Sequence, residues 1–95
     1  MALPKRIAKL IERMEAGTEI RFHELCQVCD YFFGEPRQRG TSHRVYRTPW
    51  QGDPRVNIQN NRGRAHRYQV RQVLRAVERV QAERAAEEAA TESKE

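Results

Sequence analysis

The sequence predicts a small α+β domain in which helices cover one face of an antiparallel sheet. Apolar residues recur at helical spacing near both ends of the chain, alternate at strand spacing in its middle, and are interrupted there by turns containing glycine and proline. The resulting order is α-α-β-β-β-α. Three successive strands joined by short loops favour an antiparallel meander, covered by the second and last helices in a two-layer sandwich. With 95 residues the core is modest, which favours a shallow surface site over a deep pocket.

The first predicted helix covers residues 4–16 and belongs to an N-terminal segment, 1–17, that is additional to the sandwich. Pro4 suits the first turn of a helix, and Gly17 can end it. Apolar residues follow at i, i+3, i+4 and i+7, namely Ile7, Leu10, Ile11 and Met14. We expect this helix to pack at the edge of the sandwich.

The second helix, ending at Gly34, is predicted to pack deepest because its apolar stripe has the bulkiest side chains. The stripe comprises Phe22, Leu25, Cys26, Cys29, Phe32 and Phe33. Its two cysteines form a C-x-x-C within the helix, whereas a redox motif lies at a helix N-terminus and a zinc site needs further ligands. Cys26 and Cys29 are therefore predicted to be buried and reduced.

Extended segments are predicted at 35–39, 43–48 and 55–59, with turns at 40–42, 49–54 and 60–63. The side-chain period of the second segment leaves one question open. If Val45 faces the core, strict alternation puts His43 on the same side. A position at the rim beside the turn, or a bulge in the turn, would allow the histidine to face solvent.

The last helix is predicted to begin near Arg67, with a core stripe of Val70, Val73, Leu74, Val77 and Val80. Arginines recur every four residues along another edge, at 67, 71, 75 and 79. Beyond Gln81 no apolar residue anchors the helix. Residues 18–82 are thus expected to form the domain, and the acidic tail 83–95 to fray or to be disordered.

Positive charge is concentrated in the middle of the chain. Between Arg37 and Arg71 there are nine arginines and one acid, Asp53, within a chain of net charge +5. A run of like charge is usually a solvated face, but this density across strands and loops favours contact with a nucleic acid. No apolar run reaches membrane length and no signal peptide is evident, so a cytoplasmic protein without a membrane partner is expected.

The segment GTSHRVYRTP, residues 40–49, combines residues that suit chemistry on a phosphate. His43 is the candidate catalytic residue, because an imidazole with a pKa near 6.5 can act as general base or acid at neutral pH. Gly40 allows close approach of a ligand, and Ser42 can bind phosphate or orient the ring. The surrounding cations are Arg37, Arg39, Arg44 and Arg47.

RNA cleavage by attack of the 2′-hydroxyl on the adjacent phosphate requires such a base and fixed positive charge, but no metal. The scarcity of carboxylates in 37–71 argues against a two-metal nuclease, so no metal or other cofactor is expected. On this chemistry alone, a polar surface histidine remains the commoner explanation for His43.

Other residues of the basic region are candidates for contact with RNA. Tyr46 and Trp50 could stack on unpaired bases, and Trp50, in a polar turn, is the better candidate. Ordinary packing is expected for Tyr68. Arg64 and His66, in the basic loop before the last helix, are predicted to contact phosphate.

The stretches RGTSHRVYRTP and VNIQNNRGRAHRYQVRQVL resemble the glycine–serine–histidine segment and the following strand–loop–helix of HicA toxins. These are small mRNA interferases of toxin–antitoxin operons. The resemblance covers about Ile20 to Val80. This chain is longer at both ends, and His66-Arg67 stands where one HicA branch often has Lys-Pro.

The resemblance implies a fold similar to double-stranded-RNA-binding domains, with the catalytic histidine at His43 and the glycine at Gly40. It also implies metal-independent cleavage of mRNA and neutralisation by a HicB-type antitoxin. We expect a monomer when the protein is alone and a hetero-oligomer with the antitoxin, which should cover His43 and the arginines.

Two alternatives to the ribonuclease remain. A non-catalytic RNA- or DNA-binding module of the same fold would need the basic patch but not His43. A protein-interaction domain would use its basic face to dock an acidic partner.

Overall fold

The computed structural model describes residues 3–36, 38–39, 42–50 and 55–93. Along the chain, the elements are α1 (Lys5–Glu15), α2 (Phe22–Phe33), β1 (Gln38–Arg39), β2 (His43–Tyr46), β3 (Val56–Asn61), β4 (Arg64–Ala65) and α3 (Arg67–Ser93). The strands form one sheet of order β1-β2-β3-β4, which is antiparallel throughout. The predicted α+β class and the α-α-β-β-β-α order of its main elements are confirmed.

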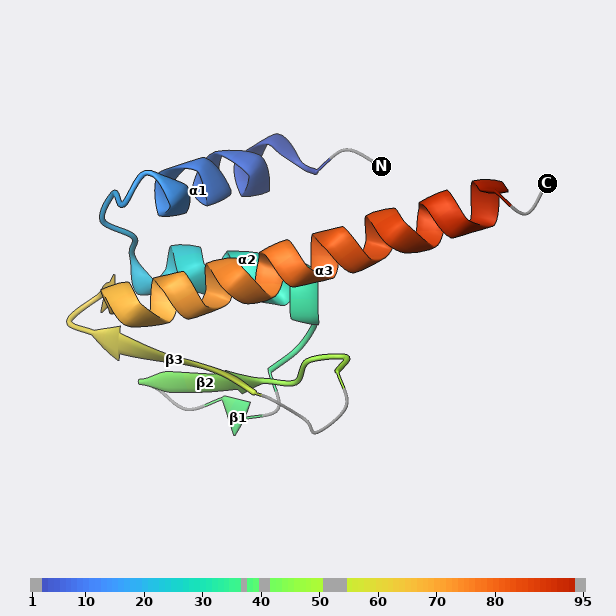
Figure 1. Cartoon of the computed structure of the whole chain (residues 1–95). Coiled ribbons are helices and arrows are strands. Elements are labelled where there is room, and N and C mark those ends of the chain that lie inside the picture. Colours follow the sequence, from blue (N-terminus) through green and yellow to red (C-terminus); the bar gives the residue numbers. More distant parts are fainter. Residues whose placement is uncertain (1–2, 37, 40–41, 51–54, 94–95) are drawn as a thin grey trace.

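Helices α2 and α3 lie on one face of the sheet, and α1 lies on the opposite side of this helix pair (Figure 1). The first helix was expected at the edge of the sandwich, but it packs on the outer side of α2 and α3 instead. The reason is its apolar stripe, since Ile7, Leu10 and Met14 are buried in the same core as α2 and α3. A position beside the sheet would leave most of that apolar surface in water.

Helix α1 ends in a Schellman motif that turns the chain toward α2. Gly17 has a φ of 76°, in the left-handed region that favours glycine. Its N–H donates to the carbonyl of Met14 at 3.2 Å, and the N–H of Thr18 donates to the carbonyl of Arg13 at 3.0 Å. The predicted end of the first helix at Gly17 is thus confirmed.

Helix α2 supplies the centre of the core, as predicted. Leu25, Val28 and Cys29 are completely buried. Burial raises the pKa of the Cys29 thiol well above its usual value, so the group stays protonated and unreactive near neutral pH. Cys26 is buried as well, which confirms that both cysteines lie in the core.

The strands differ from the predicted ranges in length and number. The first two are shorter than predicted, and β3 continues to Asn61 where a loop was expected. Arg62 and Gly63 then form a two-residue turn with φ values of 54° and 86°, and β4 returns along β3. Positive φ at both positions is typical of a type I′ hairpin, a turn that asparagine-glycine signals far better than arginine-glycine.

Helix α3 extends well past the core, to Ser93 (Figure 1). Its last core residue is Val80, and residues 81–90 are exposed. The acidic tail, for which fraying was expected, is helical up to Ser93, in keeping with its content of alanine, glutamate and arginine. No helix in the described ranges is both long and apolar enough to cross a bilayer.

Candidate nucleic-acid interface

His43 is exposed at the start of β2, on the sheet face that the helices leave open. In β2, Tyr46 is fully buried in the core, and the side-chain alternation therefore turns Val45 and His43 to the opposite face, where Val45 is also buried and His43 is exposed. The sequence left open whether Val45, and with it His43, faces the core. Tyr46 takes the core-facing position instead, so His43 does not. His43 pairs with Gln59 of β3, and its Nδ1 lies 3.4 Å from the Ser42 hydroxyl.

A shallow pocket of about 400 Å³ adjoins His43 between β3 and the first turns of α3. Gln69 fixes this junction, because its side-chain carbonyl accepts the N–H of Gln59 at 2.7 Å. Tyr68 and Gln72 project from the same helix beside it. The residues lining the pocket are His43, Arg44, Asn57, Ile58, Gln59, Tyr68, Gln69 and Gln72.

A second hollow of about 360 Å³ continues along the same helix. It shares Asn57 and Gln72 with the first, so the two adjoin, and we call them together the β3–α3 groove. The residues lining this second part are Thr48, Trp50, Arg55, Val56, Asn57, Gln72, Arg75, Ala76 and Arg79.

The β3–α3 groove carries positive charge, amides and aromatic rings, and none of the described residues lining it is acidic. Arg75 is exposed, and its side chain has no ion-pair partner among the residues that the structure describes. Cations bind phosphate, amides read base edges, and rings stack on unpaired bases. The composition of the groove therefore suits a nucleic acid better than an apolar ligand.

At the far end of this groove, Trp50 contacts two residues of α3. Its indole N–H donates to the carboxylate of Glu83 at 2.8 and 2.9 Å. The guanidinium of Arg79 lies 4.1 Å from the centre of the indole ring and 3.2 Å from Glu83. One face of the ring is thus covered by Arg79, so a base could stack only on the other face or by displacing the arginine.

Tyr46 and Arg44 point toward α2. The Tyr46 hydroxyl donates to Asp30 at 2.6 Å, and Arg44 lies 3.7 Å from the same carboxylate. Burial, reinforced by the bond to Asp30, raises the pKa of Tyr46, and a hydrogen bond with Tyr46 raises the pKa of Arg44. The idea that Tyr46 stacks on bases is wrong, because its ring is fully buried. Arg44 has its charge partly neutralised.

The other predicted site residues are distributed over separate surfaces. Arg47 is exposed beside a hollow near the end of α2, while Arg64 and His66 line a pocket near α1. Arg37 and Gly40 lie outside the described residues, and for Arg39 the structure describes only its backbone pairing with Arg44. Of the predicted residues, the β3–α3 groove brings together His43, Arg44 and Trp50.

Several groove residues were not predicted from the sequence. Tyr68, for which packing was expected, is 53% exposed and lines the pocket beside His43. Arg75 and Arg79 belong to the four-residue arginine repeat, which was the available signal for them. Nothing in the sequence marks Asn57, Gln59 and Gln72 as site residues, because amides at exposed positions are ordinary surface residues.

No group of three or more histidine, cysteine, aspartate or glutamate side chains able to hold a metal ion occurs within the described ranges. Comparison with known proteins finds no protein-family model, no curated protein and no solved structure that matches the chain.

Proposed function

We propose that this protein is a ribonuclease that cleaves RNA at the β3–α3 groove, with His43 as the catalytic residue. The observation that carries the proposal is the position of His43, exposed at one end of a groove lined by arginines, amides and aromatic rings without an acidic residue among those described. A polyanion would be attracted by the exposed Arg75 in this groove and would reach His43 at its end.

The arrangement of α2, the sheet and α3 supports this proposal. Two helices on one face of an antiparallel sheet, in the order α-β-β-β-α, are the arrangement of double-stranded-RNA-binding domains, to which the HicA resemblance also points. In this chain the groove runs along α3 and β3, and the arginine repeat of α3 supplies its charge. We therefore assign the protein a fold of that kind.

The proposed reaction is transesterification. His43 accepts the proton of a 2′-hydroxyl, the 2′-oxygen bonds to phosphorus, and the bond from phosphorus to the 5′-oxygen breaks. The 5′-oxygen takes a proton from solvent, and the other product ends in a 2′,3′-cyclic phosphate. The amides of Gln59 and Gln72 line the same pocket and supply donors for the phosphorane oxygens.

The resemblance to HicA toxins extends the proposal to physiology. We propose that the substrate is mRNA, that cleavage arrests growth, and that a HicB-type antitoxin masks His43 and the groove. A monomer acts on RNA, and a hetero-oligomer with the antitoxin is inactive. An adjacent gene encoding a small acidic protein would agree with this assignment.

The proposal is tested by incubating the purified protein and its His43→Ala variant with end-labelled RNA in the presence of a chelator. We expect the variant to lose at least about a hundredfold in cleavage rate, the typical size of general acid–base catalysis. Its RNA affinity should change little, and the product of the unaltered protein should carry a cyclic phosphate.

Arg84→Ala is the matched control, because it removes one exposed arginine of α3 that does not line the groove. Equal cleavage by the protein and by His43→Ala would overturn the catalytic assignment. Binding without cleavage by either would favour the non-catalytic RNA-binding module. No binding to RNA, together with binding to an acidic protein, would favour the interaction domain.

A further inference from the structure

A pocket of about 510 Å³ lies outside the β3–α3 groove, between α1, the connector that leads to α2, β4 and the start of α3. We call it the α1–α3 pocket. Part of its lining is apolar and belongs to the core, because Met14, Ile20 and Val70 are buried. The remaining lining is largely polar and comprises Gly17, Thr18, Glu19, Asn61, Arg64, Ala65, His66, Arg67 and Arg71.

The positive charge of this pocket is incompletely balanced. Glu19 is the one acidic residue in the described lining, and it pairs with Arg64 at 3.1 Å. Arg67 and Arg71 are exposed, one helical turn apart, and neither side chain has a polar partner in the described part of the chain. Two adjacent unpaired guanidinium groups beside an apolar surface favour a ligand with an anionic end and a flat apolar end.

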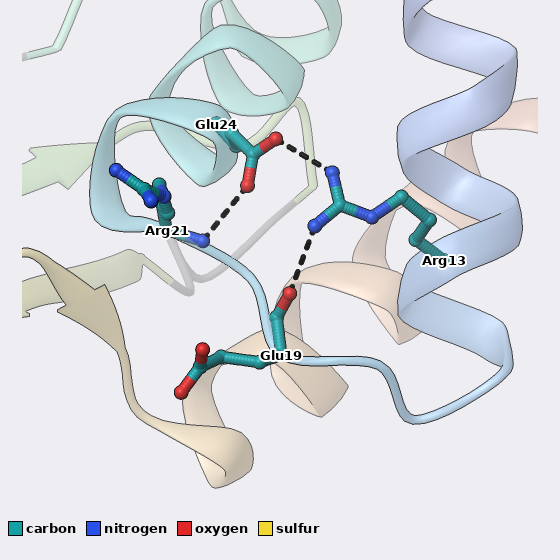
Figure 2. A network of polar contacts seen from close by, with 4 residues as sticks. All are labelled: Arg13, Glu19, Arg21 and Glu24. Carbon is teal, nitrogen blue, oxygen red and sulfur yellow. Dashed lines mark hydrogen bonds and ion pairs between the residues drawn. The ribbon is translucent and has the colours of Figure 1, made fainter.

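Backbone and side-chain bonds hold the pocket walls in place. The N–H of Ala65 donates to the carbonyl of Ile20 at 2.8 Å, which joins the connector to β4. Arg13 of α1 donates to Glu24 at 2.6 Å and to the carbonyl of Glu19 at 2.9 Å, as Figure 2 shows. Because these bonds fix the walls to one another, little ordering would accompany binding, which favours affinity for a small molecule.

We propose that the α1–α3 pocket binds one phosphorylated nucleoside. Its phosphate contacts Arg67 and Arg71, and its base lies against Met14, Ile20 and Val70. The pocket volume is within the usual range for ligands of this size. Met14, Gly17, Thr18 and Glu19 of its wall precede the stretch that resembles HicA toxins, so the site depends on the additional N-terminal segment.

The same chemistry can come from a free nucleotide or from the terminal nucleotide of an RNA in the groove. His66 lines the α1–α3 pocket, Tyr68 lines the groove, and their ring centres are 5.5 Å apart. A strand that crosses these two rings would connect the two sites. Binding of a mononucleotide does not require catalysis by His43, so the two proposals can fail separately.

The test is a titration of the isotope-labelled full chain with AMP, adenosine and inorganic phosphate, followed by the backbone amide signals of Thr18, Ala65 and Val70. We expect AMP to bind at least about tenfold more tightly than either fragment, because each fragment lacks one half of the contacts. Arg67→Ala and Arg71→Ala should each weaken AMP about tenfold. Thr18→Trp, which fills the pocket, should abolish binding.

Arg84→Ala and His43→Ala should leave AMP binding unchanged. Equal affinities for AMP and phosphate, or equal losses in the Arg67→Ala and Arg84→Ala variants, would overturn the proposal. A trinucleotide with a 5′-phosphate, compared with its 5′-hydroxyl counterpart, distinguishes the source. Preference for the phosphorylated form indicates an RNA terminus, whereas binding of AMP alone indicates a free nucleotide.

Discussion

Arginines have opposite surroundings in two regions of this molecule. Around the connector between α1 and α2, Arg13 lies against the Glu24 carboxylate (Figure 2) and Arg64 lies against that of Glu19. Along α3, Arg79 pairs with Glu83, but Arg67, Arg71 and Arg75 have no such partner within the described ranges. Paired arginines add to the stability of the fold, and unpaired ones leave positive charge for a ligand. The same residue type therefore serves two purposes, which substitutions can separate.

The largest effect on stability is expected at Asp30, where Tyr46 and Arg44 converge. Asp30→Ala should lower the free energy of unfolding by about 2 kcal/mol, because it leaves the Tyr46 hydroxyl without its acceptor. Urea unfolding provides the measurement. The double variant Asp30→Ala with Tyr46→Phe should lose less than the sum of the single variants. Additive losses would show that the two side chains are not coupled.

Arg75→Ala should weaken RNA binding by about tenfold, the equivalent of roughly 1.4 kcal/mol, with little change in stability. The slope of log affinity against log salt should fall in magnitude by about 0.7–0.9, since one phosphate contact is lost. Titrations at several salt concentrations measure both quantities. Arg13→Ala is the matched comparison, because it removes a paired arginine and should leave the slope unchanged. A similar slope change in both variants would erase the distinction between the two regions.

Glu24 provides a pH-dependent test of the paired region. Burial tends to raise the pKa of Glu24, but the bonds from Arg13 and from the N–H of Arg21 outweigh it, and the net pKa lies below the usual 4.5. A lowered pKa means that ionisation favours folding, so this contribution is complete above about pH 4.5 and is lost as the pH falls through the folded-state value.

Glu24→Gln should therefore lower the free energy of unfolding by about 1 kcal/mol at pH 7, a size set by the partial exposure of Arg13. The difference from the unaltered protein should shrink below pH 4.5. Unfolding curves at pH 7 and pH 3.5 provide the comparison. A loss of equal size at both values would show that the ionised form of Glu24 is not what stabilises the connector.

Periodicity and capping patterns predicted most of the fold because they depend on neighbours in sequence. Gly17 ends α1 and Gly34 ends α2 as expected, since both require a positive φ. A turn at 60–63 was predicted, but the tight hairpin that Arg62-Gly63 makes between β3 and β4 was missed, because arginine is an unusual residue in that turn. The packing position of α1 was not predicted, because its apolar stripe shows that one face of the helix is buried but does not show which element covers that face.

The candidate site was predicted in part. Charge clustering indicated the basic region, but not which arginines have carboxylate partners. Arg44 and Arg64 looked like their neighbours in sequence, yet Asp30 and Glu19, distant along the chain, lie beside them. The exposure of Tyr68 depends on how α3 is rotated on the sheet. Pairing and rotation are properties of the tertiary structure, so local sequence patterns do not reveal them.

The smallest effect on stability is expected at Glu19, whose carboxylate pairs with Arg64 on the surface. Both side chains are more than half exposed, so Glu19→Gln should change the free energy of unfolding by less than about 0.5 kcal/mol. The same substitution releases Arg64 toward the α1–α3 pocket and removes the negative charge from its described lining. AMP should then bind severalfold more tightly, whereas Glu78→Gln, an exposed position on α3 outside the pocket, should have no effect. Unchanged AMP affinity in Glu19→Gln, with stability preserved, would show that pairing does not decide which arginines of this protein bind an anion.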